Sequence, residues 1–239
     1  MKLVLLPGMD GTGNLFDPLL DALSGFDCEV IALPESGSQD YLSITKYVKE
    51  KLPKSDFILV AESFSGPVAS RLAKEDIKNM RGIIFVATFL SAPSRLLIPI
   101  AKALPLKLLS SLPFAELFHK YLFLGPSASN DLVQLFQSTV RSLTSNLIKA
   151  RLSSMQSLVC SLEPIELPVA YIQAASDKLV SAHKAIEFSR HFKNIIIKTI
   201  DGPHFILQAQ PVQCAVVINE LVPLLTKIGT GKPTAPSAP

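Results

Sequence analysis

The chain of 239 residues has an apolar fraction of 48% and a formal net charge of +3. This length and composition suit one full-size globular domain whose core needs neither disulfides nor metal ions to fold. The small, dispersed positive charge excludes the basic footprint of a nucleic-acid-binding protein, because lysines such as Lys46 and Lys49 alternate with apolar residues as on a solvated helix face. We therefore expect no nucleic-acid partner.

Three cysteines, Cys28, Cys160 and Cys214, are far apart in the sequence and show no CxxC or Cys/His spacing. Neither a disulfide framework nor a zinc site is predicted, and reduced, mostly buried thiols are expected. The apolar start MKLVLL is interrupted by Pro7 and Gly8, which is untypical of a signal peptide, and no run reaches the ~18 apolar residues of a membrane span. These features predict a cytoplasmic protein without stable membrane insertion.

Short runs of apolar and β-branched residues alternate with helix-like patterns along the chain. Hydrophobicity that is continuous within each run is typical of parallel strands covered on both faces. The alternation predicts right-handed βαβ crossovers in an α/β sheet, whose ligands bind beyond the carboxyl ends of the strands. The expected strands are residues 2–6, 28–33, 57–61, 82–87, 168–174 and 194–200, and the expected helices are residues 17–23, 43–52, 67–74, 181–191 and 211–228.

One segment, residues 91–161, lacks strand-like runs and consists of leucine-rich helical pieces punctuated by prolines. It predicts a helical lid inserted into a core made of residues 1–90 and 162–228. The stretch LLIPIAKALPLKLLSSLPFAELF is apolar enough to cover either the core or a ligand, and core packing is the expected role of most of its leucines. Residues 230–239 are small, polar and proline-rich, which is typical of a disordered tail.

A glycine-rich segment, PGMDGTGNLF at residues 7–16, follows the first expected strand. It can be a tight turn that caps the helix beginning near Asp17. It can also be a loop whose backbone N–H groups approach a developing oxyanion, because glycine permits close approach and positive φ. A phosphate-binding loop is less well supported, since neither GxxxxGK[ST] nor GxGxxG matches the spacing of Gly8, Gly11 and Gly13.

Two serines lie one residue apart in AESFSG, after the third expected strand. A strand that turns sharply into a helix exposes the residue at the bend and needs small neighbours two positions before and after it. Ser63 meets this requirement with Ala61 and Ser65, whereas Ser65 would have Pro67 as its second neighbour. Proline suits the first turn of the following helix. Ser63 is therefore the candidate nucleophile, and Ser65 is expected to pack or to cap the helix.

A serine hydroxyl needs a general base, and the sequence contains four histidines. His204 follows the last expected strand in a short Gly-Pro turn, from which it can point across the top of the sheet. His119 lies in the helical insertion, and His183 and His191 lie in or beside a charged helix, so these three are expected to be structural or solvated. His204 is the candidate base.

A carboxylate that orients the imidazole completes this arrangement. Asp177, in AASDKLV, lies in the loop just beyond the expected strand 168–174. Asp201, in the Asp-Gly-Pro turn, and Asp10, in the glycine-rich segment, are the competing carboxylates. Asp177 is preferred, because Asp201 has the place of a turn former and Asp10 lies on a different loop.

The chain order Ser63, Asp177, His204, each just after a strand, resembles that of the α/β-hydrolase superfamily, and the resemblance covers nearly everything except the tail. LLPGMDGTG resembles the oxyanion loop of that superfamily, with proline in place of the usual histidine. AESFSG resembles its GxSxG turn, with alanine in place of the first glycine. The resemblance implies a compact α/β-hydrolase fold with about six mostly parallel strands flanked by helices, and a helical lid after the fourth. It also implies that the backbone N–H groups of Met9 and Phe64 bind the oxyanion.

The same resemblance implies a serine carboxylesterase that hydrolyses small-molecule esters of apolar, short to medium acyl chains through an acyl-enzyme, without a metal ion or an organic cofactor. Serine at the turn, rather than aspartate, argues against dehalogenase or epoxide hydrolase chemistry. Two alternatives remain open. The first is a thioesterase or methyl-esterase acting on an acyl chain bound to an acyl-carrier protein, which Lys102, Lys107 and Lys120 of the insertion could attract. The second is a hydrolase-fold protein that binds an apolar ligand with little turnover.

Overall fold

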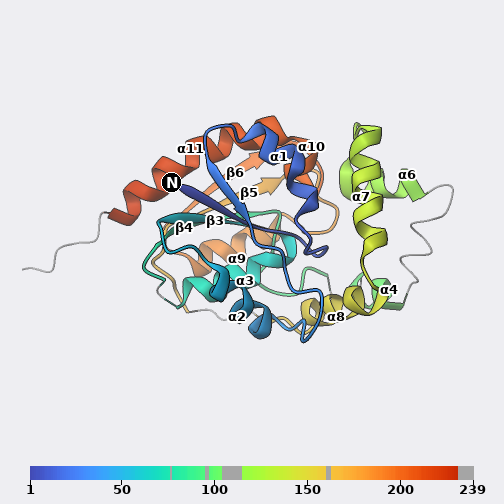
Figure 1. Cartoon of the computed structure of the whole chain (residues 1–239), viewed down its shortest axis with the longest axis horizontal. Helices are drawn as coiled ribbons and strands as arrows, with labels where there is room; N and C mark the ends of the chain where they lie inside the picture. The colour runs from blue at the N-terminus through green and yellow to red at the C-terminus, as the bar shows by residue number, and fades with distance from the viewer. Residues whose placement is uncertain (76, 95–96, 104–114, 160–162, 231–239) are drawn as a thin grey trace, which may run out of the picture.

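Six parallel strands form a single sheet in the order β2-β1-β3-β4-β5-β6 (Figure 1). The computed structural model describes residues 1–75, 77–94, 97–103, 115–159 and 163–230. All six predicted strands are confirmed, and so is the α/β-hydrolase class of the fold. The strands are β1 (Lys2–Leu6), β2 (Asp27–Val30), β3 (Phe57–Glu62), β4 (Met80–Val86), β5 (Val169–Ala174) and β6 (Ile195–Ile200).

The second strand is shorter than the sequence predicts, since it ends at Val30 rather than at Leu33. Its neighbour in the sheet is β1, which itself ends at Leu6. Beyond that point the chain bonds to the glycine-rich segment instead, through a hydrogen bond from Leu33 N–H to the Gly11 carbonyl (2.8 Å). The apolar run continues after the strand has stopped because Ile31 and Leu33 are still buried, in the apolar core that also contains Val4 and Leu6 of β1.

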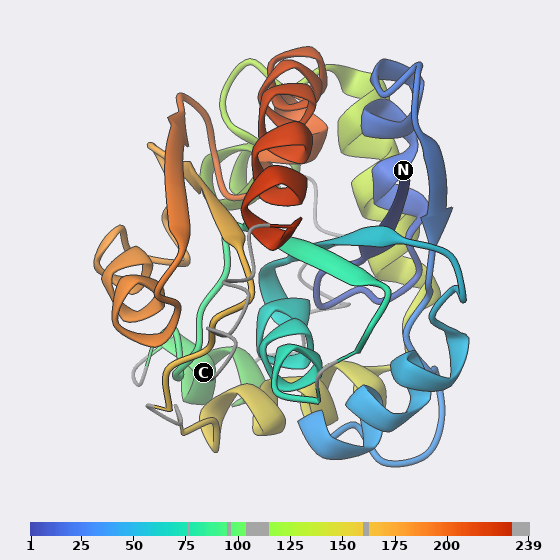
Figure 2. The same cartoon turned by 90° about the vertical axis from the view of Figure 1, so that its left-hand side faces the viewer.

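Side chains in each strand alternate between two apolar cores, as the pleat of a strand requires. In β1, Val4 and Leu6 belong to one core and Leu3 and Leu5 to the other, and all four are fully buried. Both faces of the central strands are thus covered, whereas the edge strands β2 and β6 are partly exposed (Figures 1 and 2). Helices α2 (Tyr41–Lys51), α3 (Gly66–Ala73) and α9 (His183–His191) cover the first face, and α1 (Asp17–Ala22), α10 (Ile206–Ala209) and α11 (Pro211–Thr230) cover the second.

The predicted helices of the core are present, and one further helix, α10, was not predicted. It has only four residues, too few to show a helical period. The longest helix, α11, is the one helix in the described part of the chain that is long and apolar enough, over Pro211–Ile228, to cross a membrane by length and composition. Its residues Ile218, Leu221 and Leu225 are fully buried in the second core, so this side of α11 serves the packing of the sheet.

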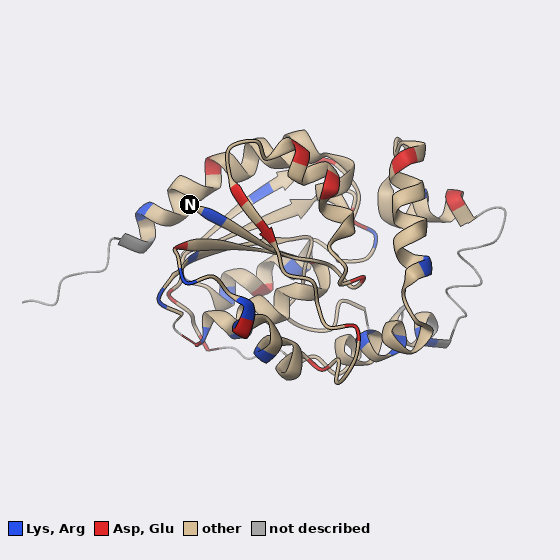
Figure 3. Ribbon diagram, viewed as in Figure 1, with Lys and Arg blue, Asp and Glu red and all other residues tan. Residues whose placement is uncertain are grey.

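Between β4 and β5 the described residues form helices, which stand on the side toward which β5 and β6 point (Figure 1). Capping explains two of their starts: Ser129 and Thr144 each accept a backbone N–H at 3.2 Å, from Leu132 and Leu147. Acidic and basic residues are interspersed over these helices and the core (Figure 3). The helices are α4 (Leu97–Ala103), α6 (Ala115–His119), a π-helical turn (Lys120–Leu124), α7 (Asn130–Ser142) and α8 (Ser145–Gln156).

Some sequence-based expectations fall on residues that the structure does not describe. These are Cys160, Lys107 and, apart from Thr230, the predicted tail at residues 230–239. The other two cysteines carry free thiols, with Cys28 half-buried and Cys214 buried.

Gly66 begins α3 directly after the turn that ends β3, and its surroundings leave no room for a side chain. A Cβ at this position would lie 2.0 Å from the Thr88 Oγ1 atom and 2.9 Å from the Thr88 Cβ atom. The backbone of Gly66 is helical, with φ −57°, so alanine would suffer from this contact alone and not from its conformation. Glycine here lets the helix approach the segment that follows β4.

We expect Gly66→Ala to lower the free energy of unfolding by about 1–3 kcal/mol, because the new methyl group overpacks against Thr88. Urea denaturation of the purified variant measures the loss. In a Thr88→Ala background, adding Gly66→Ala should cost less stability than it costs in the wild type, because the clashing hydroxyl and methyl groups of Thr88 are gone. Equal stability of Gly66→Ala and the wild type would contradict the packing argument.

Candidate active site

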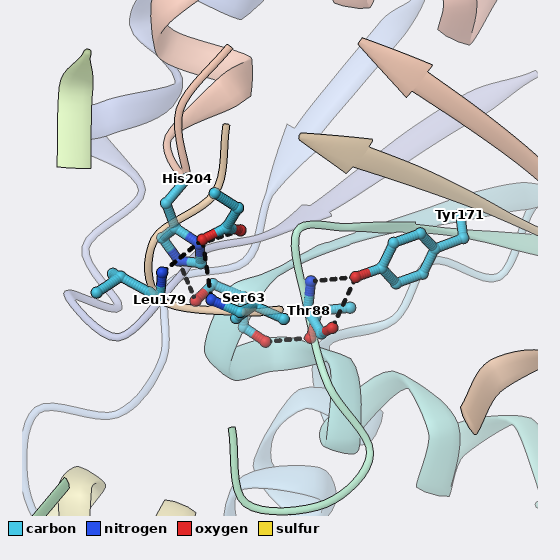
Figure 4. A network of polar contacts seen from close by, with 7 residues as sticks. Ser63, Thr88, Tyr171, Leu179 and His204 are labelled. Atoms are coloured by element: carbon cyan, nitrogen blue, oxygen red, sulfur yellow. Dashed lines mark hydrogen bonds and ion pairs between the residues drawn. The ribbon is translucent and has the colours of Figure 1, made fainter. Parts of the chain in front are cut away.

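Ser63 occupies the sharp turn between β3 and α3. Its φ of +46° lies in the left-handed region, which a residue with a side chain enters at a cost of about 1–3 kcal/mol. Two hydrogen bonds to its carbonyl oxygen hold the turn, one from the Gly66 N–H and one from the Thr88 hydroxyl. The strained backbone points the hydroxyl of Ser63 away from the sheet and toward His204 (Figure 4).

His204 bonds to both Ser63 and Asp177, so the three side chains form a continuous chain of contacts, of which Figure 4 labels Ser63 and His204. The Ser63 Oγ atom is 2.9 Å from His204 Nε2, and His204 Nδ1 is 2.8 Å from Asp177 Oδ2. The other carboxylate oxygen of Asp177 accepts the backbone N–H groups of Leu179 (2.8 Å) and Val180 (2.9 Å), which fix its orientation. With Asp177 accepting the Nδ1 proton, Nε2 is free to accept the hydroxyl proton of Ser63.

The competing serine and carboxylates lie elsewhere. Ser65 is fully buried, and its hydroxyl donates to the carbonyl oxygen of Pro7. Asp10 folds back on its own loop, where Oδ2 accepts the backbone N–H (2.9 Å) and the hydroxyl (2.7 Å) of Thr12. Asp201 is exposed in the turn after β6. Of the predicted candidates, the structure therefore brings Ser63, Asp177 and His204 together and leaves their competitors apart.

The other histidines are also separate from this group. His183 is exposed at the start of α9. His191 is buried, with its Nε2 atom 3.2 Å from the hydroxyl of Ser70. His119 is buried against the ring of Phe136, with the ring centres 5.1 Å apart. Burial lowers the pKa of both His119 and His191, which favours their neutral forms.

The glycine-rich segment passes directly beside Ser63. A Cβ placed on Gly8 would lie 3.7 Å from the Ser63 Cβ, and Gly11 and Gly13 have φ of +71° and +84°. Within the described residues, the Met9 N–H donates to no other group. Phe64, the residue after Ser63, has a fully buried ring stacked on Tyr41 with the ring centres 5.0 Å apart. The segment thus has both the position and the unused donor that an oxyanion loop requires.

Glu62, the last residue of β3, is a buried acid that the sequence analysis did not single out. Its side chain is 2% exposed, and its Oε1 atom has no hydrogen-bond partner. Burial and the nearby carboxylate of Asp10 raise the pKa of Glu62 to about 7, while Gln208, His204 and the Gly8 N–H act in the opposite direction. Its only sequence signal is an acid at the end of an otherwise apolar strand.

Metal-ligating residues do not gather anywhere in the described part of the chain. No three His, Cys, Asp or Glu side chains there are placed to share an ion. Burial, together with the charge of Glu62, raises the pKa of the Cys214 thiol to about 12, so this cysteine stays protonated at neutral pH.

The chain matches a family model described as serine aminopeptidase, S33, over residues 36–203. This span includes Ser63 and Asp177 and ends one residue before His204. No curated protein sequence matches the chain.

Several solved structures have a similar fold. An esterase from Exiguobacterium antarcticum has a TM-score of 0.79 at 12% identity, covering 93% of this chain and 92% of the esterase. A lipase-esterase related protein from Clostridium acetobutylicum has a TM-score of 0.75 at 16% identity, covering 92% and 93%. A hydrolase from Pseudomonas aeruginosa has a TM-score of 0.75 at 16% identity, covering 92% and 89%. At such identities the likeness concerns the fold and not the substrate.

The buried carboxyl of Glu62 gives the free energy of unfolding a specific pH dependence. Between pH ~4.3, where an exposed glutamate ionises, and pH about 7, the folded protein binds this proton more strongly than the unfolded chain. The contribution of Glu62 to the free energy of unfolding therefore falls by roughly 3 kcal/mol as pH rises through this window, and it stays constant at higher pH.

We expect Glu62→Gln to remove this contribution, so that the difference in stability between pH 4.5 and 7.5 changes by about that amount. Urea denaturation at both pH values measures it. Glu50→Gln, an exposed glutamate on α2, is the matched control and should keep the wild-type profile. Superimposable pH profiles for Glu62→Gln and the wild type would contradict the prediction.

Proposed function

The chain belongs to the serine aminopeptidase S33 family of α/β hydrolases, and from this premise we propose that it is a serine esterase acting on apolar, short to medium acyl chains. The observation that carries the proposal is a chain of hydrogen bonds through His204. Its Nε2 atom is 2.9 Å from Ser63 Oγ, and its Nδ1 atom is 2.8 Å from Asp177 Oδ2. Each side chain lies just beyond the carboxyl end of its own strand, where a parallel sheet places its active site.

The proposed reaction begins when the Ser63 oxygen attacks the ester carbonyl carbon while its proton passes to His204 Nε2. The carbonyl oxygen becomes negatively charged, and the N–H groups of Met9 and Phe64 stabilise it. When the tetrahedral intermediate collapses, the bond to the alcohol breaks and His204 returns the proton to the leaving oxygen. A water molecule, deprotonated by His204, then attacks the acyl-enzyme, which releases the acid and restores the Ser63 hydroxyl.

Asp177 supports this cycle without exchanging a proton. Its Oδ2 atom holds the His204 Nδ1 proton, and its negative charge stabilises the imidazolium that forms when Ser63 loses its proton. The N–H bonds from Leu179 and Val180 occupy the other oxygen, so the carboxylate cannot rotate away. His204, which acts as both base and acid, therefore keeps its orientation throughout the cycle.

Apolar packing beside His204 supports an apolar acyl group. Phe205, the next residue, contacts the rings of Phe123 and Phe136 from the insertion, with ring centres 6.0 and 5.3 Å apart. The Phe205 N–H also donates to the Phe123 carbonyl oxygen (3.1 Å). The insertion thus brings aromatic side chains to the loop that carries the base.

A carrier-bound thioester has less support. Of the three lysines that would attract an acidic carrier, Lys120 pairs with Glu116 (2.9 Å) and Lys102 donates to Gln156 (3.0 Å). Lys107 lies outside the described residues. We therefore keep the simple ester as the proposed substrate and use the thioester as an arm of the test.

We expect the protein to hydrolyse p-nitrophenyl esters of short to medium chains, and Ser63→Ala to lower kcat on the order of 10⁶-fold. A fluorophosphonate should label Ser63, as peptide mapping would show, and should still label it in Ser65→Ala. Acyl-CoA, methyl esters and aminoacyl p-nitroanilides are assayed in parallel. Faster turnover of acyl-CoA or of the anilides than of the p-nitrophenyl esters would replace the simple ester as the proposed substrate. Labelling of Ser63 without turnover of any of these compounds would favour a ligand-binding role.

We expect Asp177→Asn to lower kcat on the order of 10⁴-fold with little change in KM, because the amide cannot hold the Nδ1 proton of His204. Steady-state kinetics on the preferred p-nitrophenyl ester measure the loss. Asp201→Asn is the matched control, since Asp201 is exposed in the turn after β6 and should keep wild-type kinetics. A loss of kcat in Asp201→Asn but not in Asp177→Asn would assign the orienting role to Asp201.

A further inference from the structure

Arg151 is a buried cation in the insertion. It belongs to α8 and is 1% exposed, and its guanidinium is among the largest fully buried side-chain groups of the described chain. Burial lowers the pKa of Arg151, and the nearby acids Asp10 and Glu35 oppose this effect, so the group stays charged at neutral pH. A charge withdrawn from water is stable only where other polar atoms replace its hydration. The atoms that accept its hydrogen bonds therefore indicate the structural role of Arg151.

Those partners are neutral oxygens, two of them on the glycine-rich segment. Nη1 donates to the carbonyl oxygens of Met9 and Asp10, each at 2.7 Å. Nη2 donates to the Pro34 carbonyl (3.0 Å), and Nε donates to Gln39 Oε1 (3.0 Å). No described carboxylate forms an ion pair with Arg151. Three of these four bonds therefore hold backbone carbonyls of the core, and the fourth holds the side chain of Gln39.

The glycine-rich segment is shaped to admit this side chain. A Cβ on Gly11 would lie 2.4 Å from Arg151 Nη1 and 2.7 Å from Nη2, so no larger residue fits beneath the guanidinium. The guanidinium carbon of Arg151 is also 6.0 Å from the ring centre of Phe64, within cation–π distance. One side chain therefore contacts both Met9 and Phe64, the two residues whose N–H groups would bind the oxyanion.

We propose that Arg151 is a positioning residue that holds the Met9 and Phe64 N–H groups in the geometry of an oxyanion hole, an inference that rests on the proposed esterase function. One nitrogen bonded to two consecutive carbonyls restrains the backbone between Met9 and Asp10. The Met9 N–H has no described acceptor and follows Gly8, which lies beside Ser63, and this restraint limits how far the N–H can turn. Donors that are already aligned stabilise the transition state without rearranging during the reaction.

The same contacts tie the insertion to the site. Ser154, one turn beyond Arg151 on α8, donates to the Gln39 carbonyl (2.7 Å), and Gln39 Nε2 donates to the Pro34 carbonyl (3.1 Å). Helix α8 and the segment around Gln39 therefore form one hydrogen-bonded unit. In this unit only Arg151 reaches the Met9 carbonyl among the described residues. Of the described hydrogen bonds that join α8 to the core, those of Arg151 therefore reach the glycine-rich segment, whereas that of Ser154 ends at Gln39.

The test compares Arg151→Met and Arg151→Lys with the wild type on the preferred p-nitrophenyl ester. Arg151→Met should lower kcat roughly 10- to 100-fold with KM within about twofold, because the oxyanion exists only after substrate binding. Affinity for a trifluoromethyl ketone, whose hemiketal oxygen occupies the hole, should fall in step with kcat/KM. Arg151→Lys should be intermediate, because one ammonium can reach a loop carbonyl but cannot match the fork.

Ser154→Ala is the matched control, since it loosens α8 at Gln39 without touching the glycine-rich segment, and it should keep kcat within about threefold of the wild type. Circular dichroism and thermal unfolding check that each variant is folded at the assay temperature. A folded Arg151→Met or Arg151→Lys with wild-type kcat and wild-type ketone affinity would overturn the inference. If Arg151→Met does not fold, Arg151→Lys alone decides it by the same criterion.

The rate of fluorophosphonate labelling at Ser63 separates this inference from the proposed function. It needs the oxyanion hole but no ester, and we expect Arg151→Met to react about 10-fold more slowly. Equal labelling rates in variant and wild type would overturn the role of Arg151 and leave the esterase proposal standing. An unlabelled wild type would overturn both.

Discussion

The left-handed backbone of Ser63 is the constraint to which the surrounding structure is fitted. A residue with a side chain is stable in this conformation only where its neighbours hold it there. The Thr88 hydroxyl donates a hydrogen bond to the Ser63 carbonyl. The Tyr171 hydroxyl in turn donates to the Thr88 carbonyl (2.8 Å) and accepts the Thr88 N–H (3.2 Å). The turn is thus tied across β4 to β5 (Figure 4). Three neighbouring strands share the strain that exposes one hydroxyl.

The glycine-rich segment lies between two buried ionisable groups of opposite kind. Glu62 is on one side and Arg151 on the other, and Asp10 interacts electrostatically with both. Asp10 favours the charged form of Arg151 and disfavours that of Glu62, in each case as a smaller effect than burial.

Much of the core is predictable because its signals are local. Each strand is a continuous apolar run, and the position of Pro67 is enough to distinguish Ser63 from Ser65. Asp177 and His204 are singled out because each lies just beyond the end of an expected strand. The structure places these residues as the sequence analysis expected, and their roles are the proposal made above.

The remaining features depend on contacts between distant segments. Arg151 reaches the Met9 carbonyl across 142 positions of sequence, and Thr88 reaches Ser63 across 25. Neither residue lies in a pattern that periodicity could interpret. The shortened β2 and the four-residue α10 were missed for a related reason, because the apolar pattern of a sequence does not record where a partner strand ends or how short a helix can be.

Phe205 has a consequence for how this protein can change. It adjoins His204 in the chain, and its ring packs against Phe123 and Phe136 of the insertion. Under the proposed function, a substitution at either aromatic position that adapts the insertion to a different acyl group would also alter the packing around His204. Substrate range and catalytic geometry would then be coupled through Phe205, so a change of specificity would require compensating changes on the loop of His204.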